Sequence, residues 1–305
     1  MNDKTSTQQS SGIPGKDYPS IVQDKCTKCG ICLKVCPTMA YEMRDDQVVI
    51  VRSEMCIKCG HCGATCPANA IIESFSVPEG IPASHLDSPS FPNALQLLFR
   101  SRRSVRRYKK QPLAREDLEK ILEAGRYTAT GTNAQTINYI VITDPEKIDE
   151  LRTIALPVVM KMFAFIGKVV SMPFSSHLMG DEVRERMKNR YVPGMQLLYE
   201  RQMQGEDRIF YDAPAIMLVT GEKYDETQAF SCAAALYNCS LMAHTLGIGC
   251  CFNGFLQTSV NFNKKLKKWM GIPKTQKCYG AMTLGYPNVK YTRLVKRNPA
   301  RVRWI

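Results

Sequence analysis

Eight of the thirteen cysteines fall in two copies of one pattern, and this pattern indicates iron–sulfur chemistry. The first copy runs from Cys26 to Pro37 and the second from Cys56 to Pro67, and each has the spacing C-x2-C-x2-C-x3-C-P. Every cysteine of the first copy recurs 30 residues later in the second. Runs with this spacing hold iron–sulfur clusters. We therefore expect the chain to move electrons one at a time.

The repeat also predicts how the cysteines divide between two [4Fe–4S] clusters. In two-cluster ferredoxins the fourth cysteine of each run ligates the cluster of the other run. The ligands expected on this basis are Cys26, Cys29, Cys32 and Cys66 for the first cluster, and Cys56, Cys59, Cys62 and Cys36 for the second.

Two other uses of the cysteines fit less well. Zinc sites usually combine two separated C-x2-4-C pairs, whereas here three cysteines crowd into seven residues. Disulfide frameworks belong to small secreted domains, but this chain has 305 residues and its first twenty are polar, without an apolar signal segment. Zinc and disulfides therefore remain minor alternatives.

Composition along the chain divides it into four parts. Residues 1–20 are expected to form a disordered tail, and 21–74 a small bacterial-type ferredoxin domain with a strand at 47–52 between its cysteine runs. Residues 75–95 have the proline-rich composition of a linker. Residues 96–305 are long enough for one sizeable domain with its own core.

Hydrophobic patterning predicts an α+β fold for this larger domain, with helices flanking a mainly antiparallel sheet. Short apolar runs bounded by turn residues are typical of strands, and apolar residues at helical spacing are typical of amphipathic helices. The elements expected are a helix at 113–124, strands at 139–143 and 215–220, a long helix at 229–246 stopped by Gly247, and a strand at 280–285.

The charge is unevenly distributed. Residues 1–95 carry 8 basic and 10 acidic side chains, whereas 96–305 carry 33 and 18, and the stretch 264–305 holds twelve basic residues and no acidic one. Such a surface attracts anionic partners, although many of these lysines are also consistent with a merely solvated face. No nucleic-acid-binding signature is present. A phosphate-bearing cofactor and an acidic electron donor are the partners expected.

The apolar stretch 157–175 is the nearest approach to a membrane span. Lys161 and Lys168 interrupt it, and it falls short of about 18 uninterrupted apolar residues. We expect a buried or pocket-lining helix here, no membrane association and a cytoplasmic protein.

Four further segments could bind a second redox group. Arg100–Tyr108 contains five arginines, Thr130–Gln135 is a polar turn with backbone donors, Ile248–Phe255 is a glycine-containing loop after the long helix, and Lys296 and Arg297 lie near the end. Guanidinium groups suit a phosphate dianion better than ammonium groups do. In this order and spacing, residues 95–300 resemble the nitroreductase family of FMN enzymes, and the whole chain resembles its ferredoxin–nitroreductase fusions.

The resemblance implies a set of FMN contacts. The family's arginine–serine opening binds the flavin phosphate and ring edge, its Ser-x-x-Asn-x-Gln turn reaches the isoalloxazine edge, and a C-terminal basic residue closes on the phosphate. The residues at the matching positions are Arg102, Arg103, Ser104 and Arg106; Thr130, Gly131, Thr132, Asn133 and Gln135; Asn253 and Gly254 near flavin N5; and Lys296 and Arg297.

Two positions depart from the family pattern. Many relatives have proline where Cys251 stands and glutamate where Asn253 stands, and an uncharged Asn253 would alter nicotinamide docking and flavin potential. Cys250 and Cys251 are expected mainly to pack, with a redox or gating role as the alternative. Gly247-Ile-Gly249 follows a helix rather than a strand, so it does not indicate a Rossmann turn.

The function expected is an FMN oxidoreductase of anaerobic metabolism, a homodimer with FMN at the subunit interface as the family builds it. Reduced ferredoxin or a similar acidic low-potential donor would supply electrons through the clusters to FMN, and a nitroaromatic, quinone or activated alkene would accept them. No side chain is expected to act as a catalytic acid. The alternatives are a redox sensor or electron-transfer module without a small substrate, or the same fold catalysing reductive dehalogenation or flavin fragmentation.

Overall fold

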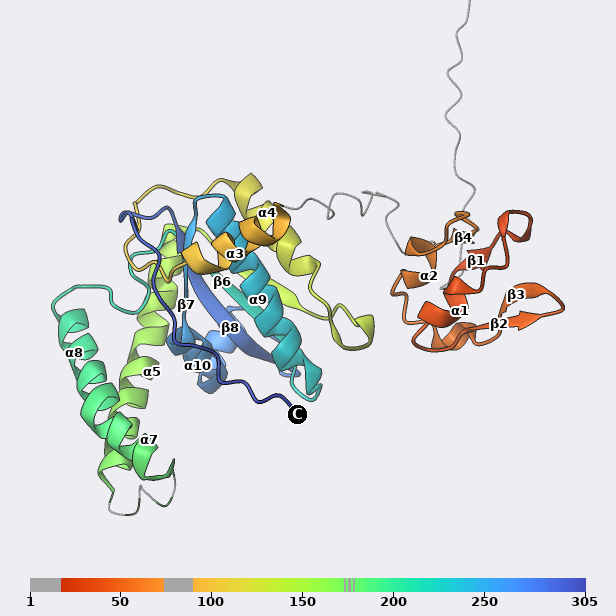
Figure 1. Cartoon of the computed structure of the whole chain (residues 1–305). Coiled ribbons are helices and arrows are strands. Elements are labelled where there is room, and N and C mark those ends of the chain that lie inside the picture. The colour runs from red at the N-terminus through yellow and green to blue at the C-terminus, as the bar shows by residue number, and fades with distance from the viewer. Residues whose placement is uncertain (1–17, 74–89, 173, 175–176, 178) are drawn as a thin grey trace, which may run out of the picture. The chain divides into compact units, whose positions relative to one another are not determined.

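The computed structural model describes residues 18–73, 90–172, 174, 177 and 179–305 (Figure 1). The chain divides into two compact units. The first comprises Met1–Ser88 with Thr132–Ala134, and the second comprises Pro89–Gly131 and Gln135–Ile305. The expected disordered tail lies outside the described residues up to residue 17, and the expected linker lies outside them from 75 to 89.

The first unit is built from two similar halves around a small core. Each cysteine run enters a short helix, and two antiparallel strand pairs enclose the halves. The core contains Ala40, Tyr41 and Val48, all buried. The elements are β1 (Ser20–Ile21), α1 (Ile31–Val35), β2 (Tyr41–Arg44), β3 (Gln47–Ile50), α2 (His61–Ala64) and β4 (Ile71–Ile72), with 3-10 turns at Gln23–Lys25 and Ser53–Met55.

The sequence repeat is also a repeat of backbone conformation. Lys28 and Lys58 both have left-handed backbones, with φ of 57° and 54°, and Gly30 and Gly60 follow with φ of 69° and 72°. Glycine suits these positions because it adopts positive φ without steric cost. The left-handed turns place both cysteine runs in the same loop conformation, immediately before α1 and α2.

The second unit contains a four-stranded sheet with the order β5-β6-β8-β7, and every neighbouring pair is antiparallel. This confirms the α+β fold with an antiparallel sheet and flanking helices. The strands are β5 (Asn138–Ile142), β6 (Ala215–Glu222), β7 (Gly249–Phe252) and β8 (Gln276–Gly285). The helices are α3 (Phe91–Ser101), α4 (Arg115–Arg126), α5 (Pro145–Ser171), α7 (Asp181–Arg186), α8 (Val192–Met203), α9 (Thr227–Thr245), α10 (Gly254–Phe262) and α11 (Lys264–Trp269), with a 3-10 turn at Gly131–Asn133 and a π-helical turn at Met187–Tyr191.

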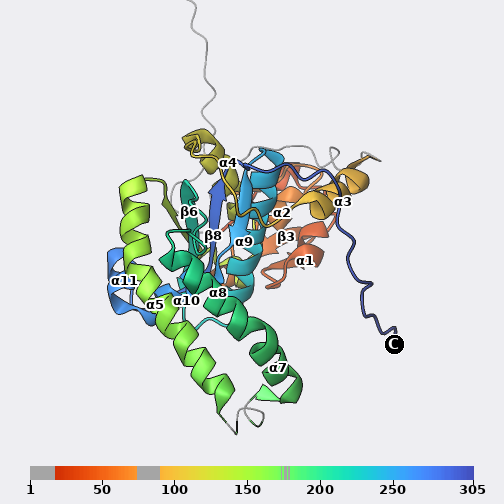
Figure 2. The ribbon, with the colours of Figure 1, turned by 90° about the vertical axis from the view of Figure 1, so that its left-hand side faces the viewer.

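Both faces of the sheet are covered, which explains why β6 is a continuous apolar run. Met217 and Val219 on one face of β6 pack with α4 and α9, whereas Ile216 and Leu218 on the other face pack with α5, α10 and α11. Figure 2 shows the sheet between these two groups of helices. The long helix expected at 229–246 is therefore α9, and it forms one wall of the core.

The apolar stretch 157–175, expected to be a buried or pocket-lining helix, is helical up to Ser171 and is only partly buried. It belongs to α5, whose far end runs beside α8 and α7 and extends away from the sheet (Figures 1 and 2). Val159 and Phe163 are buried, whereas Phe165 is 66% exposed. By length and composition α5 could cross a membrane. One helix of this kind is only weak evidence of a membrane span. Hydropathy reports how apolar a helix is, not what covers it.

Two expected boundaries also need correction. Ser20 pairs with Ile72 in the strand pair β1–β4, so the ordered part of the first unit begins before residue 21. The helix α3 starts at Phe91, so the expected linker extends too far. Pro92 contributes to that linker composition, but here it occupies the first turn of α3, where a missing N–H removes no helical hydrogen bond.

Candidate functional site

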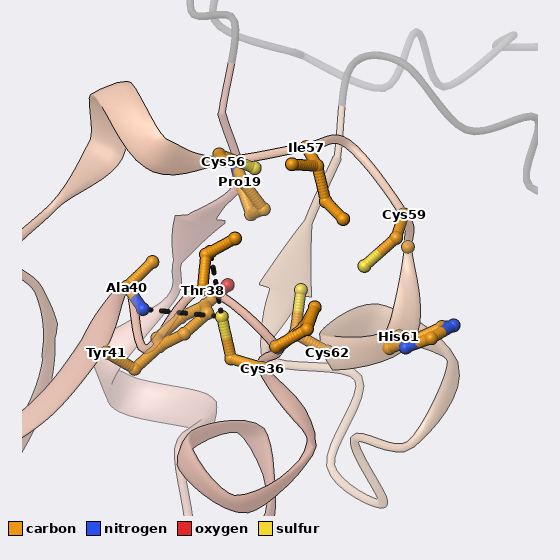
Figure 3. Close-up of a pocket in the computed structure, with 12 residues that line it drawn as sticks. Pro19, Cys36, Thr38, Ala40, Tyr41, Cys56, Ile57, Cys59, His61 and Cys62 are labelled. Atoms are coloured by element: carbon orange, nitrogen blue, oxygen red, sulfur yellow. Dashed lines mark hydrogen bonds between the residues drawn. The ribbon is translucent and has the colours of Figure 1, made fainter. Parts of the chain in front are cut away.

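The structure gathers the eight cysteines of the repeat into two quartets around two separate cavities. The first cavity is lined by Cys36, Cys56, Cys59 and Cys62 (Figure 3). The second cavity is lined by Cys26, Cys29, Cys32 and Cys66. In each quartet the fourth cysteine comes from the other run, which is the division expected for a two-cluster ferredoxin.

Backbone N–H groups lie against the crossing cysteine of each quartet. The Ala40 N–H donates to Cys36 Sγ at 3.3 Å (Figure 3). The Ala70 N–H donates to Cys66 Sγ at the same distance. Thr38 Oγ1 is 3.5 Å from Cys36 Sγ. Hydrogen bonds to ligand sulfurs stabilise negative charge and help to set the reduction potential of a cluster. The repeat thus supplies the same backbone donor to both sites.

The cavities fit a polynuclear cluster better than a single metal ion. All eight cysteines are free thiols. Within the described residues, no three His, Cys, Asp or Glu side chains converge closely enough to hold one ion. A zinc site would need four ligands about 2.3 Å from one point. The thiols instead surround a space, as ligands at the corners of a cubane do.

The thiols differ in how readily they ionise. Hydrogen bonding, first from the Ile31 backbone, lowers the pKa of Cys29. Burial acts to raise the pKa of Cys36, but backbone donors led by Ala40 outweigh it and the net shift is downward. Burial raises the pKa of Cys62 to about 12, with Glu73 adding to the shift. Iron binding removes these protons in any case, because thiolates are the ligands.

Tyr41 provides a further sign that the Cys62 cavity suits a sulfur-rich group. Its buried hydroxyl makes no hydrogen bond of good geometry among the described residues, and it lies near the Cys62 thiol. Burial is the main cause of its raised pKa, and Cys62 adds to it. Since buried hydroxyl groups normally find an acceptor, the sulfur atoms of a cluster would complete this site.

In the second unit, an arginine pair provides a candidate anion site at the end of α3. The Nε and Nη1 atoms of Arg102 and the Nε of Arg103 are buried without hydrogen-bond partners. A buried guanidinium with unused donors is costly unless an anion joins it. These donors therefore fit a phosphate group, as the FMN expectation requires.

Two aromatic rings frame this arginine pair. Tyr237 on α9 and Phe252 on β7 lie nearly parallel, with ring centroids 6.4 Å apart. The Arg102 guanidinium carbon is 5.8 Å from the Tyr237 centroid and 6.0 Å from the Phe252 centroid. Both rings are 39% exposed. The site thus combines cationic donors with accessible flat apolar surface, which suits a phosphorylated aromatic cofactor.

The backbone beyond the arginines is fixed to the sheet. Ser104 pairs with Cys250 of β7, and the Val105 N–H donates to the Cys250 carbonyl at 2.9 Å. Gly249 makes this approach possible, since a Cβ there would lie 2.6 to 2.9 Å from Val105 side-chain atoms. Tyr108 anchors the far end to β8, where its hydroxyl lies 2.9 Å from Thr283 Oγ1. The segment that carries the arginines is therefore held like an additional strand.

Sequence reasoning missed two polar groups at this site. Ser101 Oγ lies 2.8 Å from His244 Nε2. Burial lowers the pKa of His244, and the positive charges of Arg102 and Arg103 lower it further. His244 is 143 positions from Ser101 in the chain, and no local spacing links them. Only the packing of α3 against α9 brings them together.

The polar turn Thr130–Gln135, which is predicted to face the flavin, has an unusual backbone conformation. The Gln135 N–H donates to Thr130 Oγ1 at 3.0 Å. Thr132 and Asn133 both have left-handed backbones, with φ of 50° and 56°. Gly131 lies so close to α9 that a Cβ would meet Thr227 Oγ1 at 2.5 Å. The turn is thus tightly specified, and its flavin contacts stay a prediction.

The remaining expected flavin residues lie in different surroundings. Asn253 is buried and caps α10, with its Oδ1 accepting from the Leu256 N–H at 2.9 Å and its Nδ2 donating to the Ile209 carbonyl at 2.7 Å. Its amide thus has a structural use, whatever it contributes to a flavin. Arg106 lies 5.9 Å from the Tyr211 ring centroid.

Three further expected contacts stay predictions. Gly254 is the first residue of α10. Lys296 and Arg297 are exposed in the irregular segment after β8.

The two cysteines beside the expected flavin loop are buried. Cys250 is 2% exposed and Cys251 is 3% exposed. Burial raises the pKa of Cys250 to about 11, and it also raises that of Cys251, where Arg106 opposes the shift. Neutral, buried thiols behave as small apolar groups, so the structure favours the packing role.

Comparisons with known protein families give one match in each of the two units of the chain. Residues 99–286 match the nitroreductase family, and residues 18–67 match the 4Fe-4S dicluster domain. No curated protein matches the chain.

Solved structures with a similar fold include an FMN-dependent nitroreductase from Clostridium difficile R20291, with a TM-score of 0.50 and 15% identity over 70% of this chain and 100% of that one. A nitroreductase with bound FMN from Desulfitobacterium hafniense DCB-2 has a TM-score of 0.48 and 20% identity over 69% and 97% of the two chains. One from Bacteroides fragilis NCTC 9343, also with bound FMN, has a TM-score of 0.47 and 23% identity over 69% and 96%. At 15% identity the likeness to the Clostridium difficile structure concerns the fold alone, and the two structures with TM-scores below 0.5 support no conclusion.

The fold and the two kinds of site define a flavoprotein oxidoreductase joined to a ferredoxin-type domain. The chain belongs to the nitroreductase family, and it is an FMN-dependent oxidoreductase with a 4Fe-4S domain at its N-terminal side.

Proposed function

We propose that the chain relays electrons from an external low-potential donor, through two [4Fe–4S] clusters, to FMN and then to an organic acceptor. FMN supplies the conversion between one-electron and two-electron chemistry. The observation that carries this proposal is the pairing, in one chain, of two crossed cysteine quartets with an arginine pair that has three buried nitrogen donors without partners, Nε and Nη1 of Arg102 and Nε of Arg103.

The count of two clusters rests on the equivalence of the two quartets. Each has four free cysteines around its own cavity, and in each the crossing cysteine receives a backbone N–H. Ferredoxin-type clusters reach potentials near or below −400 mV. Clusters with such potentials can accept electrons from a donor such as reduced ferredoxin. The acidic surface of such a donor would be attracted to the basic stretch 264–305.

In the second unit the protein's own residues would bind and orient the cofactor. Arg102 and Arg103 would hold the phosphate through charge-assisted hydrogen bonds, which are among the strongest in proteins. Tyr237 and Phe252 would cover apolar surface and limit access of water from their side. Solvent can protonate a product at an open site, so no acidic side chain is assigned to the reaction.

The acceptor, assembly and location follow as parts of the same proposal. A nitroaromatic, a quinone or an activated alkene would suit a reduced flavin. We also propose a homodimer and a cytoplasmic location. These rest on the resemblance to the nitroreductase family and on the domain types, and size-exclusion chromatography with light scattering would test the dimer.

Steady-state turnover with two donors tests the route. The reconstituted protein should reduce a nitroaromatic faster with reduced ferredoxin than with NADPH. Cys→Ser changes in both runs should abolish the ferredoxin-driven rate while FMN stays bound. NADPH as the faster donor, with rates unchanged after the cysteine changes, would contradict the proposal. A protein that binds both groups yet reduces no small acceptor would instead favour the electron-transfer module.

A further inference from the structure

The quartet around the first cavity has a carboxylate against one of its cysteines, Cys62. Glu73 Oε1 lies 3.3 Å from Cys62 Sγ and accepts a hydrogen bond from the Gly63 N–H at 3.1 Å. The residue 30 positions earlier, which would occupy the same place in the other half, is Met43, and it is 42% exposed. A carboxylate therefore faces one quartet at a position where the repeat provides an uncharged side chain to the other.

Gly63 leaves the space that this contact occupies. A Cβ at position 63 would lie 2.6 Å from Glu73 Oε1 and 2.9 Å from its carboxyl carbon. The repeat-related residue is Leu33, which packs against the core of the unit. One half of the repeat thus has both the acid and the space for it, and the other half has neither. Both differences lie at matched positions of the repeat and concern the same contact.

The hydrogen bond from the Gly63 N–H is the contact of the carboxylate that does not depend on the Cys62 thiol proton. Iron binding removes the Cys62 thiol proton, so Glu73 then faces a thiolate ligand while the Gly63 N–H still donates to it. Reduction adds one negative charge to the cluster, and a nearby fixed anion makes that addition less favourable.

We propose that Glu73 makes the two clusters unequal, by lowering the reduction potential of the cluster held by Cys36, Cys56, Cys59 and Cys62 relative to the other. The proposal rests on the proposed function, in which each quartet holds one cluster. An electron from a one-electron donor would then reside mainly on the cluster of Cys26, Cys29, Cys32 and Cys66. The first unit would have a built-in direction of electron flow.

An EPR-monitored redox titration of the reconstituted full chain tests this proposal. Glu73→Gln keeps the shape and the acceptor for the Gly63 N–H but removes the charge. It should raise the lower of the two cluster potentials and leave the higher one in place. We expect the equilibrium distribution of one electron between the clusters to change about tenfold, which is about 59 mV for a one-electron couple.

Two further variants make the test specific. Asp45→Asn removes the same charge from the exposed β2–β3 turn, where asparagine tolerates the left-handed backbone, and it should leave the gap between the potentials unchanged. Gly63→Ala keeps a helical backbone but displaces the Glu73 carboxylate, so it should narrow the gap as Glu73→Gln does.

The possible outcomes distinguish the proposed function from the proposed role of Glu73. A parent protein with fewer than two reducible clusters would overturn both the proposed function and this inference. Two clusters whose potentials do not move in Glu73→Gln, or move together, would overturn only the inference. An equal narrowing of the gap in Asp45→Asn would also overturn it, because the effect would then be one of net charge and not of this contact.

Discussion

Replacing Arg102 with methionine should separate cofactor affinity from protein stability. Methionine keeps an unbranched apolar side chain but removes the guanidinium. Two of the donors removed, Nε and Nη1, are buried without partners. In the FMN-bound protein they would be used by the phosphate, and in the FMN-free protein they are not.

The expected loss of affinity follows from those donors. Hydrogen bonds to charged groups contribute about 1.5–3 kcal/mol, so loss of the guanidinium should weaken FMN binding roughly ten- to hundredfold. The stability of the FMN-free protein should not fall. Relief of an unsatisfied buried group is worth about 1–3 kcal/mol, whereas the contacts with the Tyr237 and Phe252 rings contribute about 0.5–1 kcal/mol each.

The assay is a fluorescence titration of FMN into the apoprotein, paired with urea unfolding of the same samples. Arg107→Met is the matched control, because it removes the same charge from an exposed position five residues further along the chain. It should leave FMN affinity nearly unchanged at moderate salt. Equal weakening in both variants would refute a specific phosphate contact, and so would unchanged affinity in Arg102→Met.

Three other predictions concern separate parts of the structure. Cys36→Ser should remove the cluster of the Cys56 run and leave the other, so that bound iron falls by half and one EPR signal remains; loss of the signal from its own run would contradict the crossed quartets. Gly249→Ala should destabilise the second unit by about 1–3 kcal/mol in urea unfolding, because the new methyl group meets Val105; unchanged stability would show that Val105 can move aside. The pKa of His244 is lowered in the folded protein, so this group favours folding above its ordinary pKa of about 6.5 and the benefit is lost as pH falls. The unfolding free energy of the FMN-free protein should therefore decline less steeply below pH 6.5 in His244→Gln, and identical pH profiles would refute this assignment.

The cysteine quartets could be predicted from the sequence because their information is local. Spacing within each run and the offset between runs fix which thiols share a loop, and the left-handed backbones at Gly30 and Gly60 repeat accordingly. The strands β6 and β8 were also predictable, because each contains an apolar run bounded by turn residues. Such runs are typical of strands in a sheet that is covered on both faces.

Features that depend on tertiary packing were not predictable. The pairing of Ser101 with His244 joins residues that no local pattern connects. The exposure of Phe165 on α5 depends on which elements cover that helix, and hydropathy carries no such information. Glu73 also gave no signal, because its importance lies in a contact with Cys62 and in the space left by Gly63.

The most direct test of the electron route is a single anaerobic turnover started by mixing the oxidised protein with reduced ferredoxin. Cluster reduction would be followed by freeze-quench EPR and flavin reduction by its visible absorbance. The account predicts that the clusters are reduced first, that flavin absorbance then bleaches, and that bleaching is lost when both cysteine runs carry Cys→Ser changes. Flavin bleaching at an unchanged rate in the cluster-free protein would contradict it.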